Sequence, residues 1–312
     1  MPYRRAVAAA FVAAWLWPQA ARSDTTTYEQ KIWETQIGQQ RYLSYQQRGE
    51  IVPQQSPLYQ TLDSIGNEIA SVADSQYFAP FHFVLLDEPM PNATAMPGGN
   101  VYVTAGLLSF LKNRDELAGV LCHEVNHDIH HDMYAVYQAT QGGRVPQNPN
   151  AVAYERQTET NADRAGAYTC AKAGFNPWGM VWNLRLHAQT PNGAQQGGPN
   201  SDHPSDDQRA ADLIALFRSD PATFGRFRDD VAAAKPLGVT PVQVSRQYAN
   251  PSYPQQYQPY PQYPQQYQPY PQYPQQYQPY PQYPQQYQPY PQTPQQQGPY
   301  PPPPLPPCYP RC

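Results

Sequence analysis

The sequence predicts an α+β domain that is mostly helical with a small sheet, followed by a disordered tail rich in proline, glutamine and tyrosine. Apolar residues recur at helical spacing in most segments between residues 24 and 236, whereas β-like runs are confined to residues 81–104. Charged side chains are frequent in the first 250 residues, and Arg311 is the only one beyond them. One domain over residues 24–236 is therefore expected, with a different kind of segment on each side.

The first 23 residues predict a signal peptide. Arg4 and Arg5 precede an apolar run of about a dozen residues, Ala6–Trp17, which is short for a membrane-spanning helix of about 20 residues. Small residues follow, as a cleavage site requires. An uncleaved membrane anchor is the alternative. The mature chain is expected to be exported, and its mild formal charge of −4 gives no reason to expect nucleic acid as a partner.

The order of elements follows from periodicity and from helix-capping residues. Asn113 is expected to cap a long helix, and Ser205 with Gln208 forms a capping-box pattern. Helices are expected at residues 28–47, 57–73, 113–137, 152–173, from 177, at 205–217 and at 221–235, and strands at 81–87 and on both sides of Pro97-Gly98-Gly99. Motifs near residues 125 and 160 are therefore expected on helices.

The four cysteines fit an exported chain. Cys122 and Cys170 fall inside predicted helices and are expected as small buried residues, although an exported protein could join them in a disulfide. Cys308 and Cys312 close a short loop and could pair with each other.

Residues 237–312 form a low-complexity tail. The decapeptide YPQQYQPYPQ occurs four times from Tyr253 to Gln292. Proline at this density excludes helix and sheet interiors and favours extended polyproline II structure. Two interpretations stay open: a disordered spacer, or a sticky segment that binds an outer-membrane or other envelope component.

The stretch LCHEVNHDIHHD, residues 121–132, predicts a metal site. His123 and His127 are four residues apart, so a helix places both imidazoles on one face, where they can share a cation. Glu124 lies beside the first of them and is a candidate general base. The pattern His-Glu-x-x-His is typical of zinc-dependent hydrolytic chemistry.

A solvated helix that happens to be rich in histidine is the alternative for this stretch. Leu121, Val125 and Ile129 argue against it, because they form an apolar stripe beside the pair and indicate a packed helix. His130 and His131 are expected at the surface or behind the metal ligands.

A third ligand is expected from the next helix, in the stretch ETNAD. Glu159 can supply a carboxylate, and Asp163, one turn later, can accept a hydrogen bond from the other ring nitrogen of a ligand histidine. An exposed acidic face is the alternative. Two imidazoles and a carboxylate favour one Zn²⁺ per chain.

His203 and Arg209, in the stretch HPSDDQR, are candidates to stabilise an oxyanion near the metal. The alternative is an ordinary loop histidine and an arginine that pairs with Asp206.

These motifs resemble the gluzincin-type zinc metallopeptidases that include HtpX, the CAAX prenyl proteases and, most closely, compact periplasmic BepA-type proteins. The resemblance covers roughly residues 34–217: HEVNH matches the zinc helix, ETNAD matches Glu-x-x-Ala-Asp, NATAMPGG matches a stretch ahead of the zinc helix, and HPSDDQR matches His-Pro followed by arginine. It implies a zincin-like domain with an edge strand at the active site that binds substrate, formed here by Asn92, Ala93, Thr94, Ala95 and Met96.

The resemblance also implies a function. It predicts an exported, periplasmic metalloendopeptidase, membrane-associated at most, that hydrolyses unfolded or misassembled envelope proteins, with Glu124 activating a zinc-bound water. The alternative is a latent, zinc-stabilised protease that acts as a chaperone or assembly factor because His203 occludes the metal. Two departures stand out: BepA-type members often carry histidine where this chain has Asp132, and they continue into a helical repeat domain that is not evident here.

Overall fold

The computed structural model describes residues 26–140, 149–190, 193, 201 and 203–239. The expected signal peptide and repeat tail, with the pairing of Cys308 and Cys312, lie outside these residues. The helices are α1 (Tyr28–Arg48), α2 (Pro57–Ala73), α3 (Ala105–Phe110), α4 (Arg114–Ile129), α5 (Asp132–Thr140), α6 (Pro149–Ala173), α7 (Trp178–His187), α8 (Asp206–Ser219) and α9 (Pro221–Phe224), and the strands are β1 (His82–Leu86), β2 (Ala93–Met96) and β3 (Asn100–Thr104).

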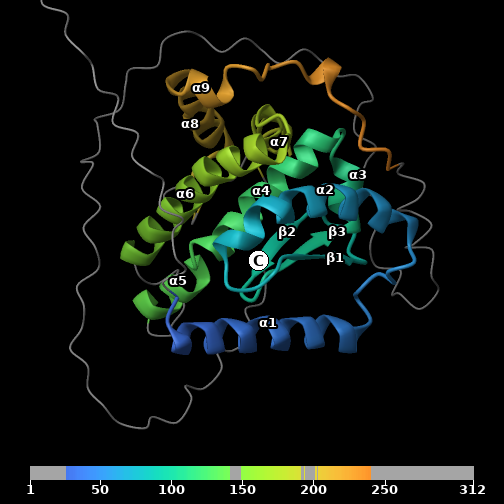
Figure 1. Ribbon diagram of the computed structural model, residues 1–312, viewed down its shortest axis with the longest axis vertical. Helices are drawn as coiled ribbons and strands as arrows, with labels where there is room; N and C mark the ends of the chain where they lie inside the picture. The colour runs from blue at the N-terminus through green and yellow to red at the C-terminus, as the bar shows by residue number, and fades with distance from the viewer. Residues whose placement is uncertain (1–25, 141–148, 191–192, 194–200, 202, 240–312) are drawn as a thin grey trace, which may run out of the picture. The chain divides into compact units, whose positions relative to one another are not determined.

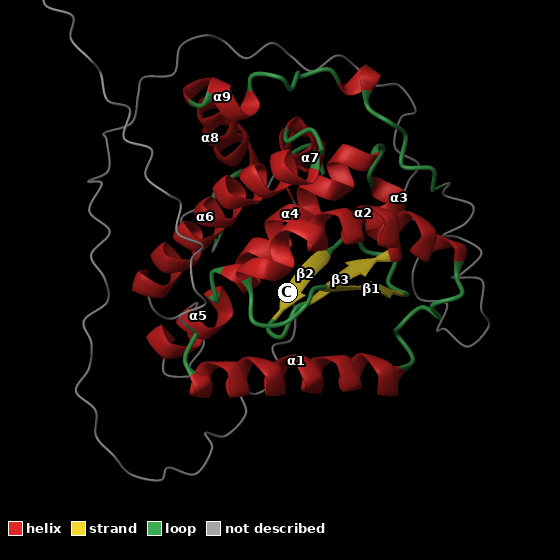
Figure 2. Ribbon diagram, in the orientation of Figure 1, coloured by secondary structure: helices red, strands yellow, loops and turns green. Residues whose placement is uncertain are grey.

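A three-stranded mixed sheet lies between two layers of helix, which confirms the expected α+β class (Figure 2). β3 is central and pairs with β1 in parallel and with β2 antiparallel. One face of the sheet packs on α2 and α4, and its other face packs on α1 (Figure 1). Alternate side chains explain the division: Val101 and Val103 point into the larger core, whereas Tyr102 meets Trp33 and Ile37 of α1.

The two outer strands of the sheet differ in how their edges are covered. The β1 edge is covered by residues 50–52, because Val52 donates to the Leu85 carbonyl at 2.9 Å and Asp87 donates to the Glu50 carbonyl at 2.8 Å. Among the described strands β2 has one neighbour, β3. Asn92 accepts a hydrogen bond from Thr104, so by alternation Thr94 and Met96 also bond toward β3, while the backbone groups of Ala93 and Ala95 face away from it. β2 therefore presents an open edge.

Helices α4 and α6 pack closely against each other. α4 begins with a complete capping box between Asn113 and Glu116, as the sequence indicates. Gly166 of α6 faces the backbone of α4, and a β-carbon there would come within 3.1 Å of the Cys122 carbonyl oxygen and of the His123 nitrogen. The absence of a side chain at Gly166 therefore allows α6 to approach the middle of the motif helix.

A disulfide joins these two helices. Cys122 of α4 and Cys170 of α6 are fully buried and are bonded across a separation of 48 residues. The expected burial of both cysteines is confirmed, and so is the disulfide that the sequence left open. Closing a loop of this length stabilises the fold by about 4 kcal/mol in the chain-entropy account. The bond ties the helix that carries His123 to the helix that carries Glu159.

The observed elements depart from expectation in three places. The helix expected over residues 113–137 is interrupted at His130 and His131, so that α4 and α5 are separate. α3 is a short additional helix that periodicity does not reveal. The helix expected over residues 221–235 ends at Phe224, because Asp229 is drawn to α7 by hydrogen bonds from Trp182 at 2.6 Å and Arg185 at 3.0 Å.

No helix in the described part of the chain combines the length and the apolar character that crossing a membrane requires.

Candidate metal centre

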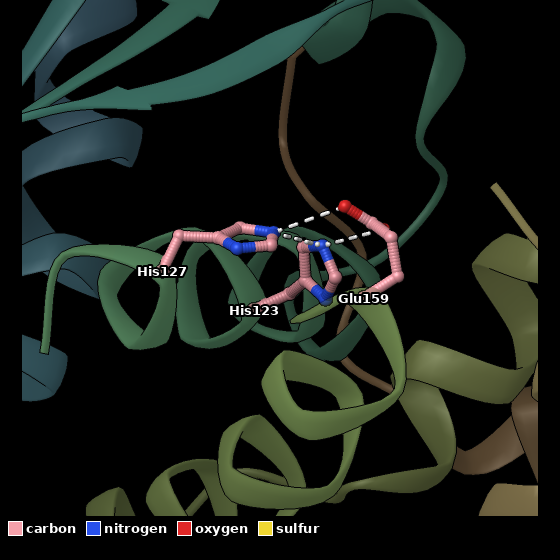
Figure 3. A group of neighbouring side chains, drawn as sticks. All are labelled: His123, His127 and Glu159. Atoms are coloured by element: carbon pink, nitrogen blue, oxygen red, sulfur yellow. Dashed lines mark hydrogen bonds and ion pairs between the residues drawn. The ribbon is translucent and has the colours of Figure 1, made fainter. Parts of the chain in front are cut away.

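His123, His127 and Glu159 converge on one point (Figure 3). α4 carries the two histidines one turn apart, and α6 brings the glutamate to them from the facing helix. The two Nε2 atoms lie 3.0 Å apart. The Glu159 oxygens lie 3.4 Å from His123 Nε2 and 3.3 Å from His127 Nε2. The structure therefore brings together the three residues that the sequence suggests as metal ligands.

The donor set fits a zinc ion in type and spacing. Ligand atoms at about 2.0–2.1 Å from a tetrahedral zinc are about 3.3 Å from one another. The three observed separations, 3.0, 3.4 and 3.3 Å, cluster around that value. Two imidazoles and one carboxylate also leave a fourth position for water or substrate, as catalytic sites require. Among the histidine, cysteine and acidic side chains of the described residues, these three have ligand atoms close enough together to share a metal ion.

The ring of His123 is oriented by Asp163. The Asp163 carboxylate lies 3.0 Å from His123 Nδ1, which leaves Nε2 facing the ligand group. Arg209 holds the same carboxylate with two hydrogen bonds of 2.7 Å, from Nε and Nη2. Its Nη1 also lies 3.3 Å from Glu159. The alternative pairing of Arg209 with Asp206 does not occur, since Asp206 is bonded to His187 at 2.8 Å.

Asp132 orients the ring of His127 in the same way, and sequence reasoning did not assign it a role. Its carboxylate lies 2.8 Å from His127 Nδ1. In the single helix expected over residues 113–137, a residue five positions after His127 would point about 140° away from it. An acidic residue a few positions after a pair of ligand histidines therefore predicts a hydrogen-bond partner for one of them only when the helix is known to end between the two.

Burial and mutual contacts shift the ionisation of the cluster. Burial alone would lower the pKa of His127, but hydrogen bonds with Asp132 and Glu159 raise that pKa well above its usual value. Burial alone would raise the pKa of Glu159, but hydrogen bonds with His123, His127 and His203 hold it well below its usual range. A metal needs neutral imidazoles. Metal binding therefore displaces a proton from the cluster and weakens as the pH falls.

Glu124 lies between the ligand pair and the open strand edge. Its Oε2 accepts a hydrogen bond of 2.7 Å from the backbone nitrogen of Ala95 in β2. The carboxylate of the general-base candidate is thus placed against the strand that the resemblance assigns to substrate binding. Of that segment, Ala93 and Ala95 present their backbone outward, whereas Asn92, Thr94 and Met96 bond toward β3.

His203 approaches the cluster from the loop before α8. Its Nδ1 lies 3.3 Å from the Glu159 carboxylate, and its side chain is 41% exposed. This histidine therefore reaches the ligand group from the solvent side. Of the other histidines in the motif, His131 binds Glu34 rather than the cluster.

Two histidines of one helix and a glutamate of the next, placed so that they could hold an ion, with a second glutamate beside an open strand edge, are the arrangement of a zincin-type metallopeptidase. Comparison with known proteins finds similarity to one particular family. Residues 58–148 match the model of peptidase family M48, whose members are generally zinc-dependent. The similarity to this family supports a zinc metallopeptidase and agrees with the resemblance seen in the motifs.

Individual relatives agree with this family. The chain is 27% identical to the beta-barrel assembly-enhancing protease of Escherichia coli (strain K12) over 177 residues, which cover 47% of this chain and 36% of that protein. It is 26% identical to the Yersinia pestis protein of the same name over 152 residues, covering 39% and 31% of the two chains. It is 44% identical to the mitochondrial metalloendopeptidase OMA1 of Schizosaccharomyces pombe over 45 residues, 14% of this chain and 13% of that one. The matched part is about a third of each beta-barrel assembly-enhancing protease.

Proposed function

We propose that the protein is an exported zinc metalloendopeptidase that cuts extended segments of unfolded or misassembled envelope proteins. The observation that carries the proposal is the convergence of His123, His127 and Glu159, whose ligand atoms lie within 4.8 Å of one another. The candidate base Glu124 follows the ligand His123 in sequence and contacts Ala95 on the open edge of β2. No other arrangement of the described residues supports a different reaction class as well.

The chemistry needs a metal and a base. When bound, zinc would polarise the scissile carbonyl and lower the pKa of a water molecule. Glu124 would accept the proton of the attacking water and pass it to the leaving amine. Asp163 and Asp132 would keep the two imidazoles in the orientation and tautomer that ligation needs.

His203 and Arg209 are the candidates for the developing oxyanion. The partly exposed imidazole of His203 can reach a substrate from the solvent side. Arg209 is held by two hydrogen bonds to Asp163, so its contribution includes fixing that carboxylate behind His123.

The open edge of β2 supports an extended substrate. A peptide can add to an unpaired edge as a further strand and use the outward backbone groups of Ala93. The N–H of Ala95, the next outward residue, is bonded to Glu124, so a substrate that used it would have to displace that carboxylate. This binding mode recognises the substrate's backbone rather than its side chains. It requires a substrate segment that is free of its own secondary structure. An unfolded protein meets this condition, whereas a folded one does not.

Two observations support export. The buried Cys122–Cys170 disulfide is typical of proteins that mature in an oxidising compartment. The beta-barrel assembly-enhancing proteases are similar to this chain over 152 to 177 residues. The periplasm, with envelope proteins as substrates, is the setting that fits both.

Chelation tests the proposed function. The purified chain should cleave casein, a substrate without stable fold, and cleavage should stop in 1,10-phenanthroline because the ligands lose their metal. Activity should return when one equivalent of zinc is added after the chelator is removed. A tightly folded protein of similar size is the control substrate and should stay intact. Cleavage of casein that continues at full rate in the chelator would contradict the proposal.

His203 favours a second candidate, a latent protease that binds clients without cutting them. Its imidazole lies 3.3 Å from the ligand Glu159 and could occupy the position that water needs. Replacing His203 by Ala distinguishes the two. An oxyanion role predicts that casein cleavage falls by about 100- to 1,000-fold, the usual loss for one such donor. A latent protease would instead gain activity in the variant, and the client-binding function would then be preferred.

A further inference from the structure

The turn between α4 and α5 has an unusual backbone. His131 has a φ of 57°, and among the described residues it is the non-glycine residue in the left-handed region. This conformation is disfavoured for a side chain with a β-carbon. The turn is closed by hydrogen bonds from His130 to the Asn126 carbonyl at 3.0 Å and from His131 to the Asp128 carbonyl at 2.9 Å.

The left-handed residue is what brings Asp132 to the metal ligand His127. A continuing helix would place Asp132 about 140° away around the axis. The turn at His131 instead directs Asp132 back toward His127, and its carboxylate lies 2.8 Å from His127 Nδ1. The orientation of one metal ligand therefore depends on the conformation of His131.

The ring of His131 is held by the N-terminal helix α1. Nδ1 lies 2.8 Å from Oε1 and 3.1 Å from Oε2 of Glu34, and Nε2 lies 2.9 Å from the hydroxyl of Thr26. The rings of Tyr77 and Phe78 pack beside it, with centroids at 5.4 and 6.4 Å. Contacts on several sides thus stabilise a backbone conformation that is otherwise unfavourable.

Glu34 in turn depends on His131. Its side chain is 1% exposed, and its carboxylate also accepts hydrogen bonds from the Tyr77 hydroxyl at 2.5 Å and from Gln30 at 2.9 Å. A buried carboxylate that loses a partner is strongly destabilised. The docking of α1 and the left-handed turn therefore favour each other.

We infer that His131 is a positioning residue that couples α1 to the metal centre. Glu34 holds His131, His131 sets the turn, and the turn places Asp132 on His127. Coupling between two equilibria is reciprocal, so metal binding also stabilises the docked state of α1. This inference rests on the metal site of the proposed function, but it concerns metal affinity and helix docking rather than cleavage.

The test measures the zinc dissociation constant of the purified chain by competition with a chromogenic chelator. His131→Gly allows the left-handed turn but removes the ring, and Glu34→Gln keeps the shape of its partner but removes the charge. Each should weaken zinc binding by about three- to tenfold, below the 10- to 100-fold typical of losing a ligand's direct partner. The double variant should be no weaker than either single variant, because both remove the same link.

Tyr59→Phe is the matched control. It deletes one buried hydrogen bond, from the Leu85 nitrogen at 3.0 Å, without changing Glu34, His131 or Asp132, and it should leave zinc affinity unchanged. Hydrogen exchange supplies a second readout. Adding zinc should slow the exchange of α1 amides in the wild type, and this effect should be lost in His131→Gly.

The outcomes separate the inference from the proposed function. The coupling would be overturned if both single variants bound zinc as tightly as the wild type. It would also be overturned if zinc did not change the hydrogen exchange of α1 amides in the wild type. If the wild type still held zinc and cut casein, the proposed function would stand. A wild type that holds no zinc would overturn both. Should His131→Gly fail to fold, Glu34→Gln with its control decides the question alone.

Discussion

Replacing Glu159 by Gln is expected to remove both the metal and the activity. The amide keeps the size of the side chain but loses the negative charge that lies within 3.4 Å of both ligand nitrogens. Zinc affinity should fall by at least about 100-fold, since even the loss of an outer partner costs 10- to 100-fold. Metal analysis after dialysis, together with casein cleavage, measures the effect.

The same substitution at Glu68, an exposed residue of α2, is the control and should change neither quantity. A Glu159→Gln variant that retained one zinc per chain would show that the third ligand is elsewhere. The close approach of Glu159 on α6 to the two histidines on α4 would then have a role other than metal binding.

Replacing Arg209 by Met is expected to destabilise the fold. Arg209 and Asp163 are nearly buried, with side chains 13% and 7% exposed, and they share two hydrogen bonds of 2.7 Å. Removing one partner of a buried pair costs about 3–5 kcal/mol. Denaturant unfolding of the metal-free protein should show this loss, and the same change at exposed Arg218 of the same helix should not. The Arg209→Met, Asp163→Asn double variant should recover most of the loss, because no unpaired charge then remains.

The loss of folding stability in Arg209→Met should depend on pH in a definite direction. Burial by itself would raise the pKa of Asp163, but the charge and hydrogen bonds of Arg209 lower it to about 2. The pair therefore stabilises the wild type above about pH 4, the ordinary value for aspartate, and this contribution is lost as the pH falls toward 2. Without Arg209, burial of Asp163 is less opposed and its pKa rises, so the deficit of Arg209→Met should shrink on acidification. A deficit that is independent of pH would contradict this account of the pair.

The elements predicted with most accuracy are those that local signals determine. α2 begins at the Pro57 that follows its capping serine, and α4 begins with the Asn113–Glu116 capping box. The spacing of His123 and His127 needs only helical geometry, and Glu159 needs only that two helices face each other. Short-range chemistry therefore sufficed for the three residues that gather around the candidate metal position.

The features that sequence reasoning missed depend on tertiary contacts. The break between α4 and α5 is set by Glu34, which lies 97 residues before His131 in sequence and holds its ring. Without that break, Asp132 cannot be assigned to His127. The sequence left the disulfide as an alternative, and choosing it required knowing that Gly166 lets α6 come close enough for Cys170 to meet Cys122. Likewise, the partner of Arg209 is on another helix, α6, rather than the nearby Asp206 that sequence proximity suggested.

The central claim is that the protein holds a metal and uses it through Glu124. The most direct test compares zinc content and casein cleavage, side by side, in the wild type and in Glu124→Gln. Gln keeps the shape of the side chain but cannot accept the proton of the attacking water. The account predicts one zinc per chain in both proteins and cleavage in the wild type alone. Equal cleavage by the variant, or no zinc in either protein, would contradict it.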